Sequence, residues 1–308
     1  MSGQPEATET ALRGAGTAVP VWGDRLGRRG RLFLRSGENR VLLALLAALL
    51  LLCAVPVARL PANPIRVNVA LRFETPSWGT ASGAHVLGTD FLGRDVLSRI
   101  VYAARYTLFI SGIATVLATA SGTLAGLLAG YYGGGTDAAI MRAVDMMMAF
   151  PVILLVLALV AVLGPSLFNV IFVLALSAWA AYARVIRSAV LSLREMDFVE
   201  AARAMGARDT RILWHHLLPG LVSPIVVIST FQLARFILTE SAISFLGLGV
   251  APPMATWGGM IGDGRNYLYE AWWVTAFPGA AIVGTVLIFN FLGDAMRDAF
   301  DPFTIGRR

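Results

Sequence analysis

The chain has 308 residues, of which 57% are hydrophobic and 14% are charged. Soluble globular domains are about 25% charged, so this composition, with a mean hydropathy of +0.70, excludes an ordinary soluble protein and indicates an integral membrane protein. The net charge of +6 does not indicate nucleic-acid binding, because no basic face interleaved with aromatic residues is present. A cluster of arginines instead precedes the first apolar run, where the positive-inside rule places cationic residues.

Residues 1–40 are rich in Gly, Ala, Thr and Arg and lack apolar periodicity, which predicts a flexible cytoplasmic tail. The apolar run that follows, residues 41–58, leads into RLPANP rather than into a small-residue cleavage site. It is also longer than the about 7–15 apolar residues of a secretory signal peptide. A retained membrane helix is therefore favoured over a signal peptide. The single cysteine, Cys53, lies in this run and is expected to be a buried, inert thiol.

Five further apolar stretches are long enough to cross a membrane, which predicts an all-α protein with six transmembrane helices. These stretches are residues 106–130, 146–163, 167–187, 219–246 and 272–293. Six spans place both termini on one side, and the arginine-rich tail assigns that side to the cytoplasm. The expected organisation is a tail (1–40), a first transmembrane helix (41–60), an extracytoplasmic segment (61–105), a core of five transmembrane helices (106–294) and a cytoplasmic C-terminal tail (295–308).

The extracytoplasmic segment contains an amphipathic stretch at residues 86–101. Leu92, Val96 and Ile100 form an apolar stripe opposed by charged residues. The pattern predicts a helix that lies in the membrane interface, and contact with an extracytoplasmic binding protein is the alternative. The loop 247–271 shares that alternative, and the tryptophans in and just after it are predicted to be interface aromatics: Trp257, Trp272 and Trp273.

Small residues recur on one face of the second span. Gly122, Gly126 and Gly130 lie at four-residue intervals, so another helix can approach this face closely. The predicted role is packing within the helix bundle, in preference to any role in ligand binding.

The motifs of a membrane enzyme are missing. The chain has no lysine and no G-x-x-x-x-G-K-[ST] pattern, so it lacks the residue with which a P-loop reaches nucleotide phosphates. His85, His215 and His216 are too few and too poorly spaced for a metal site. We therefore expect no catalytic residue, no metal and no cofactor on the chain. If ATP powers the protein, another subunit must bind it.

The stretch DFVEAARAMGARDTRILWHHLLPG, residues 197–220, is a polar interruption between two membrane-length runs. Asp197 and Glu200 predict a capping box with Asp197 as N-cap, and Gly206 suits the left-handed position that ends a helix. The two-turn helix between them has one apolar face, with Arg203 outside it: Phe198, Ala201, Ala202 and Met205. An interfacial helix that covers the ends of the spans and a docking helix for a soluble partner fit this pattern equally well.

The fifth span contains four polar residues, which are costly inside a membrane and are functional candidates by default. Gln232, Arg235 and Thr239 fall within about 60° of one another around the helix, with Glu240 somewhat beyond. Two interpretations remain open. Arg235 and Glu240 either hold the bundle together through neighbouring spans or line a translocation path.

The segment EAARAMG (200–206), followed by LLP, resembles the EAA motif of permease subunits of ABC importers. Further stretches are similar, in the family's order, to the C-type permease subunit of dipeptide and oligopeptide importers. They are HVLGTDFLGRDVLSRIVYAARYTL (85–108), GYYGGGTDAAIMRAVDMMMAFP (130–151), LGPSLFNV (163–170), YARVIRSAVLSLREMDFVEAARAMGA (182–207), ESAISFLGLGVAPPMATWGGMI (240–261) and FNFLGDAMRDAFDP (289–302). This ordered series is far more specific than one short motif would be.

The resemblance implies a type I ABC importer permease core in a bacterial cytoplasmic membrane. It also implies a homologous second permease subunit, two ATPase subunits that bind ATP and Mg, and an extracytoplasmic substrate-binding protein. In this family the EAA helix is the coupling helix and sits in a groove of the ATPase, which places it here within the loop 188–218. The docking face would be Phe198, Ala201, Ala202 and Met205, with Glu200 and Gly206 at the helix ends.

The function that the resemblance implies is import of peptides by alternating access, and nickel or glutathione import is the alternative within the family. Val86, His215 and Gly220 replace a usual proline, a frequent arginine and a frequent asparagine of the family. These departures leave the coupling role intact but weaken a fine assignment of substrate. An ATP-independent secondary transporter is the alternative from another class, although the internal repeats that it would predict are not found.

Overall fold

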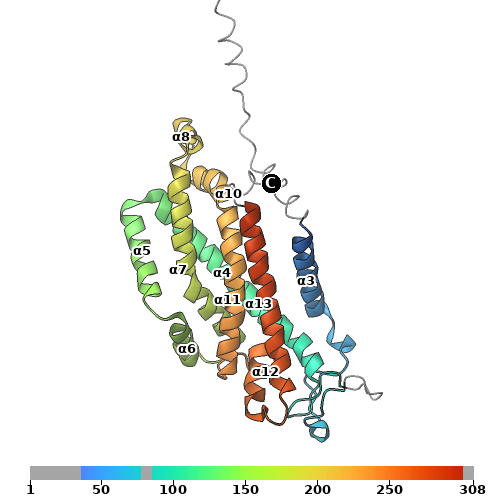
Figure 1. Ribbon diagram of the computed structural model, residues 1–308. Coiled ribbons are helices and arrows are strands. Elements are labelled where there is room, and N and C mark those ends of the chain that lie inside the picture. Colours follow the sequence, from blue (N-terminus) through green and yellow to red (C-terminus); the bar gives the residue numbers. More distant parts are fainter. Residues whose placement is uncertain (1–35, 78–84, 301–308) are drawn as a thin grey trace, which may run out of the picture.

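The computed structural model describes residues 36–77 and 85–300, which form helices joined by loops (Figure 1). The long helices are α3 (Gly37–Ala54), α4 (Val96–Tyr132), α5 (Gly134–Met148), α6 (Val152–Leu163), α7 (Leu167–Arg194), α11 (Val222–Phe245) and α13 (Trp273–Phe300). The short helices are η1 (Val57–Arg59), η2 (Val69–Leu71), α8 (Asp197–Ala204), α9 (Asp209–Arg211), η3 (Ile212–Leu217), α10 (Leu218–Gly220), α12 (Trp257–Gly264) and η4 (Arg265–Tyr267). Strand-like pairing in the described residues is limited to one bridge between Thr89 and Asp95. The all-α prediction is confirmed.

The two predicted tails lie mostly outside the described residues, which begin at residue 36 and end at residue 300. The parts that are described belong to helices. Residues 37–40 are the first turn of α3, and residues 295–300 are the last turns of α13. Helix α3 thus starts and ends four residues before its predicted apolar run 41–58, whereas α13 extends past the end of its run 272–293.

Five helices of the described chain, α3, α4, α7, α11 and α13, are long and apolar enough to cross a membrane. A sixth span exists only if α5 and α6, which are bent by 86°, count as one. The predicted span 146–163 is therefore wrong as a single straight helix. The break falls at Pro151, the N-cap of α6, because proline lacks an N–H group and disfavours helical geometry in the residue before it. The 12 residues of α6 extend about 18 Å, less than the about 30 Å of a bilayer core.

The predicted interfacial helix at 86–101 is absent. Helix α4 instead begins at Val96 and runs without a break for 37 residues. Asp95 caps it, since its Oδ2 accepts a hydrogen bond from the Ser98 N–H at 2.7 Å. Leu92 lies in the turns before the helix, whereas Val96 and Ile100 are buried in its first turns. A helix that passes directly into a span needs no separate interfacial segment.

The second part of helix α4 packs closely against α7. The contact runs over the predicted glycine stripe Gly122, Gly126 and Gly130. A Cβ atom at Gly126 would lie 2.5 Å from the Ala183 carbonyl oxygen and 2.9 Å from the Ile186 Cβ atom. Any side chain at this position would therefore push α7 away from α4, which confirms the predicted packing role of the stripe.

Arginines at one end of α7 tie it to its neighbours. Arg187 binds the Asp137 carboxylate of α5 through Nε and Nη2, both at 2.5 Å. Arg184 Nη2 donates to Asp145 Oδ1 at 2.6 Å, and Arg194 Nη1 donates to the Gly130 carbonyl of α4 at 3.1 Å. Helices α4, α5 and α7 thus form one connected unit at this end.

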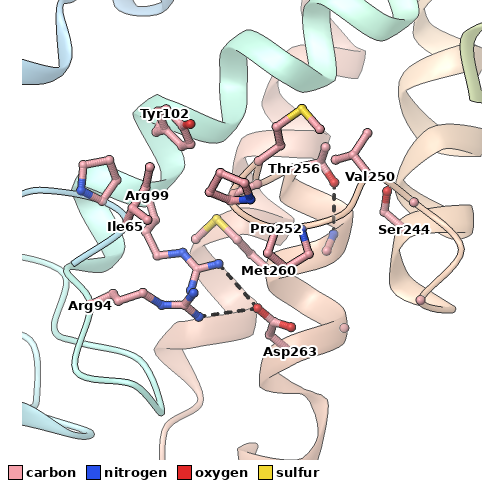
Figure 2. A pocket seen from close by; sticks show the side chains of 18 of the residues that line it. Ile65, Arg94, Arg99, Tyr102, Ser244, Val250, Pro252, Thr256, Met260 and Asp263 are labelled. Atoms are coloured by element: carbon pink, nitrogen blue, oxygen red, sulfur yellow. Dashed lines mark hydrogen bonds and ion pairs between the residues drawn. The ribbon is translucent and has the colours of Figure 1, made fainter. Parts of the chain in front are cut away.

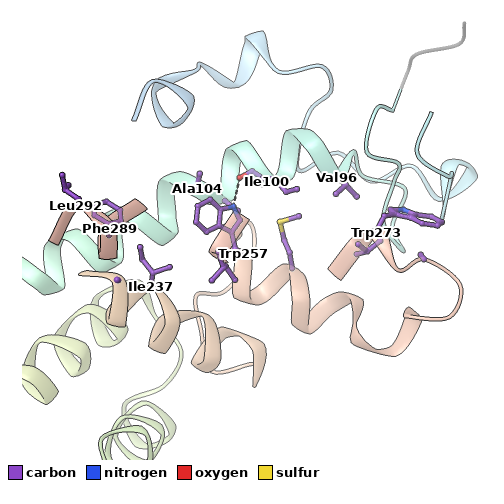
Figure 3. Packing of buried hydrophobic residues seen from close by; sticks show 14 residues of the cluster. Val96, Ile100, Ala104, Ile237, Trp257, Trp273, Phe289 and Leu292 are labelled. Atoms are coloured by element: carbon purple, nitrogen blue, oxygen red, sulfur yellow. Dashed lines mark hydrogen bonds between the residues drawn. The ribbon is translucent and has the colours of Figure 1, made fainter. Parts of the chain in front are cut away.

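At the opposite end, α12 packs among α4, α11 and α13 (Figures 1 and 3). The Trp257 indole N–H donates to the Ile100 carbonyl at 3.0 Å, and the Trp273 indole N–H donates to the Thr89 carbonyl at 3.1 Å. Trp257 is 1% exposed and Trp273 is 5% exposed. Both are core residues with satisfied donors, so the prediction that they are interface aromatics is wrong. Trp272, which is exposed, remains compatible with it.

We expect Gly126→Leu to destabilise the folded chain by about 1–3 kcal/mol or more, because overpacking forces two backbones apart. Gly112→Leu is the matched control, since a Cβ atom on Gly112 of the same helix meets nothing within 4 Å. Thermal unfolding of the purified chain in detergent, followed by size-exclusion chromatography, measures both. Equal melting temperatures for the two variants would contradict the packing role.

Candidate functional site

Helix α8 projects from one end of the bundle and is the predicted coupling helix (Figure 1). Its start differs from the predicted capping box. Met196 is the N-cap, Asp197 is the first helical residue, and no side chain caps the helix. The reason is that the Met196 carbonyl already accepts the first turn's hydrogen bond, from the Val199 N–H at 2.9 Å. Asp197 and Glu200 therefore lie in the first turn, where carboxylates stabilise the positive end of the helix dipole.

The end of α8 is the one predicted. Gly206 has a φ angle of +78°, a left-handed conformation that favours glycine. Its N–H donates to the Arg203 carbonyl at 2.9 Å, and the Ala207 N–H donates to the Ala202 carbonyl at 3.0 Å. These two hydrogen bonds make a Schellman motif, which stops the helix after two turns.

The residues of the predicted docking face of α8 differ in how far they are buried. Ala202 is buried at 2% exposure against the chain's own body, together with Val199, which lies outside the predicted apolar face. Met205 is 81% exposed and Ala201 is also exposed, whereas Phe198 is half-buried. Ala202 is therefore not available to a partner's groove. Glu200 and Arg203 are exposed beside the open face.

Aromatic and polar contacts fasten α8 to the ends of the spans. The Arg203 guanidinium lies over the Tyr131 ring of α4, 5.4 Å from its centroid, and the Tyr131 hydroxyl donates to Asp209 Oδ1 at 2.7 Å. The Phe198 ring lies 6.5 Å from the His216 ring of η3. Beneath them is a buried cluster: Leu127, Ile186, Val190, Val199, Ala202, Ile212, Leu213, Leu217 and Leu221. A displacement of α8 would therefore be transmitted to α4, α7 and α11.

The short helix α9 begins at Asp209. It continues through η3, a π-helix, and through α10 to Leu221, which precedes α11. The path from α8 into the fifth predicted span is thus helical almost throughout, which makes it stiff.

The structure separates the four polar residues of α11. Glu240 is fully buried, and its Oε1 accepts from the Ser244 hydroxyl at 2.6 Å. Gln232 is buried at 9% exposure. Thr239 is half-buried and its hydroxyl donates to the Arg235 carbonyl at 2.9 Å. Arg235 is exposed, and its side chain makes no ion pair or hydrogen bond within the described chain.

A network of charges at the end opposite α8 was missed by sequence reasoning. Asp90, 1% exposed, accepts from Arg94 Nε at 2.7 Å and also from Arg99 Nη1. Asp263 of α12 lies on the other side of the two guanidinium groups. Burial, reinforced by Arg99, lowers the pKa of Arg94 from its usual value, yet arginine stays charged at neutral pH. The i,i+4 spacing of Asp90 and Arg94 was the available signal, and Asp263 lies too far along the chain to be linked by spacing.

Groups of three or more His, Cys, Asp or Glu side chains that could hold a metal ion do not occur in residues 36–77 and 85–300. His85 contacts Asp95 at 3.0 Å, while His216 packs on Phe198. The histidines described here thus serve in hydrogen bonding and packing.

Comparison with known proteins places the chain in a family. Residues 122–306 match the family described as binding-protein-dependent transport system inner membrane component. A dipeptide transport system permease protein of Alkalihalophilus pseudofirmus is 43% identical, over 72% of this chain and 73% of the relative. A glutathione transport system permease protein of Pectobacterium atrosepticum is 46% identical over the same shares.

The fold has a counterpart among solved structures. A chain of the MetNI methionine ABC transporter, in inward-facing conformations, superposes with a TM-score of 0.53 at 21% identity, over 67% of this chain and 97% of that one. At this identity the likeness concerns the fold alone, and that fold is the type I ABC importer permease. The family match and the two relatives together show that the chain belongs to the inner membrane components of binding-protein-dependent transport systems, the permease subunits of ABC importers.

Proposed function

We propose that the chain is the permease subunit of an importer that moves short peptides into the cytoplasm by alternating access, driven by ATP hydrolysis on partner subunits. Relatives that are dipeptide and glutathione permeases support a substrate of peptide class. Glutathione itself is the second candidate substrate, supported by the relative of that name. The missing lysine supports the assignment of ATP and Mg to two partner ATPase subunits, because a P-loop requires that residue.

The observation that carries this proposal is the two-sided character of α8. Val199 and Ala202 bind it to the bundle, whereas Ala201 and Met205 are left exposed on the other side. A large exposed methionine at the tip of a rigid helix suits a groove on another protein. The docking face is accordingly Ala201 and Met205 with the exposed part of Phe198, and Glu200, Arg203 and Gly206 shape its ends.

A rigid α8 converts movement of the ATPase pair into movement of the spans. Arg203 and Tyr131 link it to α4, and the helical path through η3 links it to α11. Nucleotide shifts the permease between inward-open and outward-open states only if ATP binding changes the free-energy difference between these two states. Docking of α8 in a groove that closes with ATP supplies that difference.

The proposed orientation places α8 and both termini in the cytoplasm of a bacterium, with the protein in the cytoplasmic membrane. The arginines that surround α8 support it: Arg184, Arg187, Arg194, Arg203, Arg208 and Arg211. The opposite end, with α12 and the segment before α4, then faces outward and receives a substrate-binding protein. A homologous second permease completes the translocation path.

Arg235 is proposed to face that path. It lies near the middle of a membrane-length helix and is exposed in the single chain. A charged side chain in contact with lipid is costly, so its surroundings are the water-filled path or the second permease. Glu240, fully buried under its own chain, is proposed to hold the bundle together instead.

The function is tested by reconstituting the chain in proteoliposomes with the second permease, the ATPase pair and the cognate binding protein. We expect retention of the ATPase on the purified chain and ATP-dependent uptake of a labelled dipeptide. Uphill uptake by this chain alone, with no ATPase retained, would establish a secondary transporter and overturn the proposal.

Ala201→Asp is expected to lower the rate of ATP-dependent uptake by about tenfold or more. The reason is that an unpaired carboxylate buried in an apolar groove of the ATPase costs several kcal/mol. Ser192→Asp is the matched control, since it adds the same charge at an exposed position of α7 outside α8. Uptake and ATPase retention are measured together in proteoliposomes. Normal uptake by the Ala201→Asp variant would show that α8 does not dock through this face.

Arg235→Met is expected to leave assembly and ATPase retention intact while changing the ratio of uptake rates for acidic and neutral dipeptides by about tenfold, the effect of about 1.4 kcal/mol. Arg235→Lys keeps the charge and is expected to preserve most of the original ratio. Poor assembly of Arg235→Met with an unchanged ratio would assign the residue to the permease interface.

A further inference from the structure

A cavity of about 730 Å³ opens at the end of the bundle opposite α8 (Figure 2). Its walls come from three parts of the chain: the segment before α4 with the first turns of that helix, the end of α11 with the loop that follows it, and α12 with the first residue of η4. The volume lies within the about 300–1,000 Å³ of small-molecule sites. The cavity is therefore large enough for a short peptide.

The charged groups on the cavity wall carry excess positive charge. They are Arg94, Arg99 and Arg265, with Asp263 as the carboxylate among them. Asp90 lies behind the wall, buried at 1% exposure, and even when it is included the guanidinium groups outnumber the carboxylates. An anionic group is accordingly favoured inside the cavity.

Arg94 and Arg99 make short contacts with Asp90 behind the wall and longer contacts with Asp263 on the cavity side. Asp90 accepts from Arg94 Nε at 2.7 Å and from Arg99 Nη1, which orients both guanidinium groups. On the cavity side, Asp263 Oδ2 lies 3.4 Å from Arg99 Nη2 and 3.6 Å from Arg94 Nη2 (Figure 2). Charge-assisted hydrogen bonds are about 2.7–2.9 Å long, so the contacts with Asp263 are weak.

An unsatisfied donor marks the place where a ligand would bind. Arg94 Nη2 is buried and makes no hydrogen bond within the described chain. Asp263 is 43% exposed, so it can turn toward solvent at little cost. An incoming carboxylate at proper distance would satisfy the Arg94 donor and replace the loose contact of Arg99.

The remaining wall suits the other parts of a peptide. Ile65, Leu246, Met254 and Met260 supply apolar surface, and the Tyr102 hydroxyl, which also contacts the Tyr106 hydroxyl at 3.1 Å, supplies a polar group. A site of this kind fixes one end of a ligand by charge and tolerates varied side chains along the rest.

We propose that this cavity binds the terminal carboxylate of a short peptide through Arg94 and Arg99, in exchange for the carboxylate of Asp263. The inference rests on the proposed function, to which it adds a site where this chain itself holds the substrate on the outward side. Asp263 acts as an internal competitor that occupies the arginines when the cavity is free. Removal of its charge therefore strengthens binding of the ligand.

The test is titration calorimetry of the full chain in nanodiscs, without ATPase or nucleotide, using dialanine and its C-terminal amide. We expect dialanine to bind and the amide to bind at least about tenfold more weakly, because it lacks the carboxylate. Asp263→Asn is expected to bind dialanine about tenfold more tightly, and Arg94→Gln to lose binding. A gain in affinity cannot result from misfolding.

Asp294→Asn is the matched control, because it removes a carboxylate from an exposed position of α13 outside the cavity wall. Its affinity for dialanine should equal that of the unaltered chain. Equal binding of dialanine and its amide, absence of binding, or unchanged affinity in Asp263→Asn would each overturn the proposal. The proposed function is judged separately, since ATP-driven uptake can persist without this site, and carboxylate binding can be measured even where uptake fails.

Discussion

The close contact between α4 and α7 is the constraint on which the rest of the structure depends. It exists because Gly122, Gly126 and Gly130 present no side chain to α7, so two backbones meet inside a membrane, where no hydrophobic force drives helices together. The contact brings the end of α7 beside Tyr131 at the end of α4. Helix α8, which follows α7, therefore rests on Tyr131 through Arg203 and moves with both spans.

The charged residues at the two ends of the bundle have different roles. At the α8 end, arginines pair with acids of α5 and with a carbonyl of α4, which joins neighbouring helices into one body. At the other end, Asp90 makes short ion pairs with Arg94 and Arg99, whereas Asp263 lies 3.4 Å or more from the same two arginines. The Asp90 pair with Arg99 is the buried one, and it stays formed because a buried charge without a partner is costly. The long contacts of Asp263 leave Arg94 and Arg99 able to bind an anionic ligand in its place.

Local patterns predicted the parts of the site that depend on local physics. Gly206 was predicted to end α8 because only glycine adopts its φ angle easily, and the structure confirms it. The start was wrong by one residue, since the Met196 carbonyl rather than the Asp197 side chain begins the helix. The interfacial helix at 86–101 was wrong because an apolar stripe has the same spacing whether it meets lipid or, as for Val96, the core of the same protein.

By itself the sequence determined five of the membrane-length helices, the polar helix between two of them and the family, because hydropathy, periodicity and ordered motifs are properties of consecutive residues. Only the tertiary structure decided which side of α8 remains open, since Ala202 and Met205 belong to the same stripe and differ only in what packs against them. It alone also brought Asp263 to Arg94 and Arg99. Contacts between residues so distant in the chain are set by the packing of whole helices, which no local spacing records.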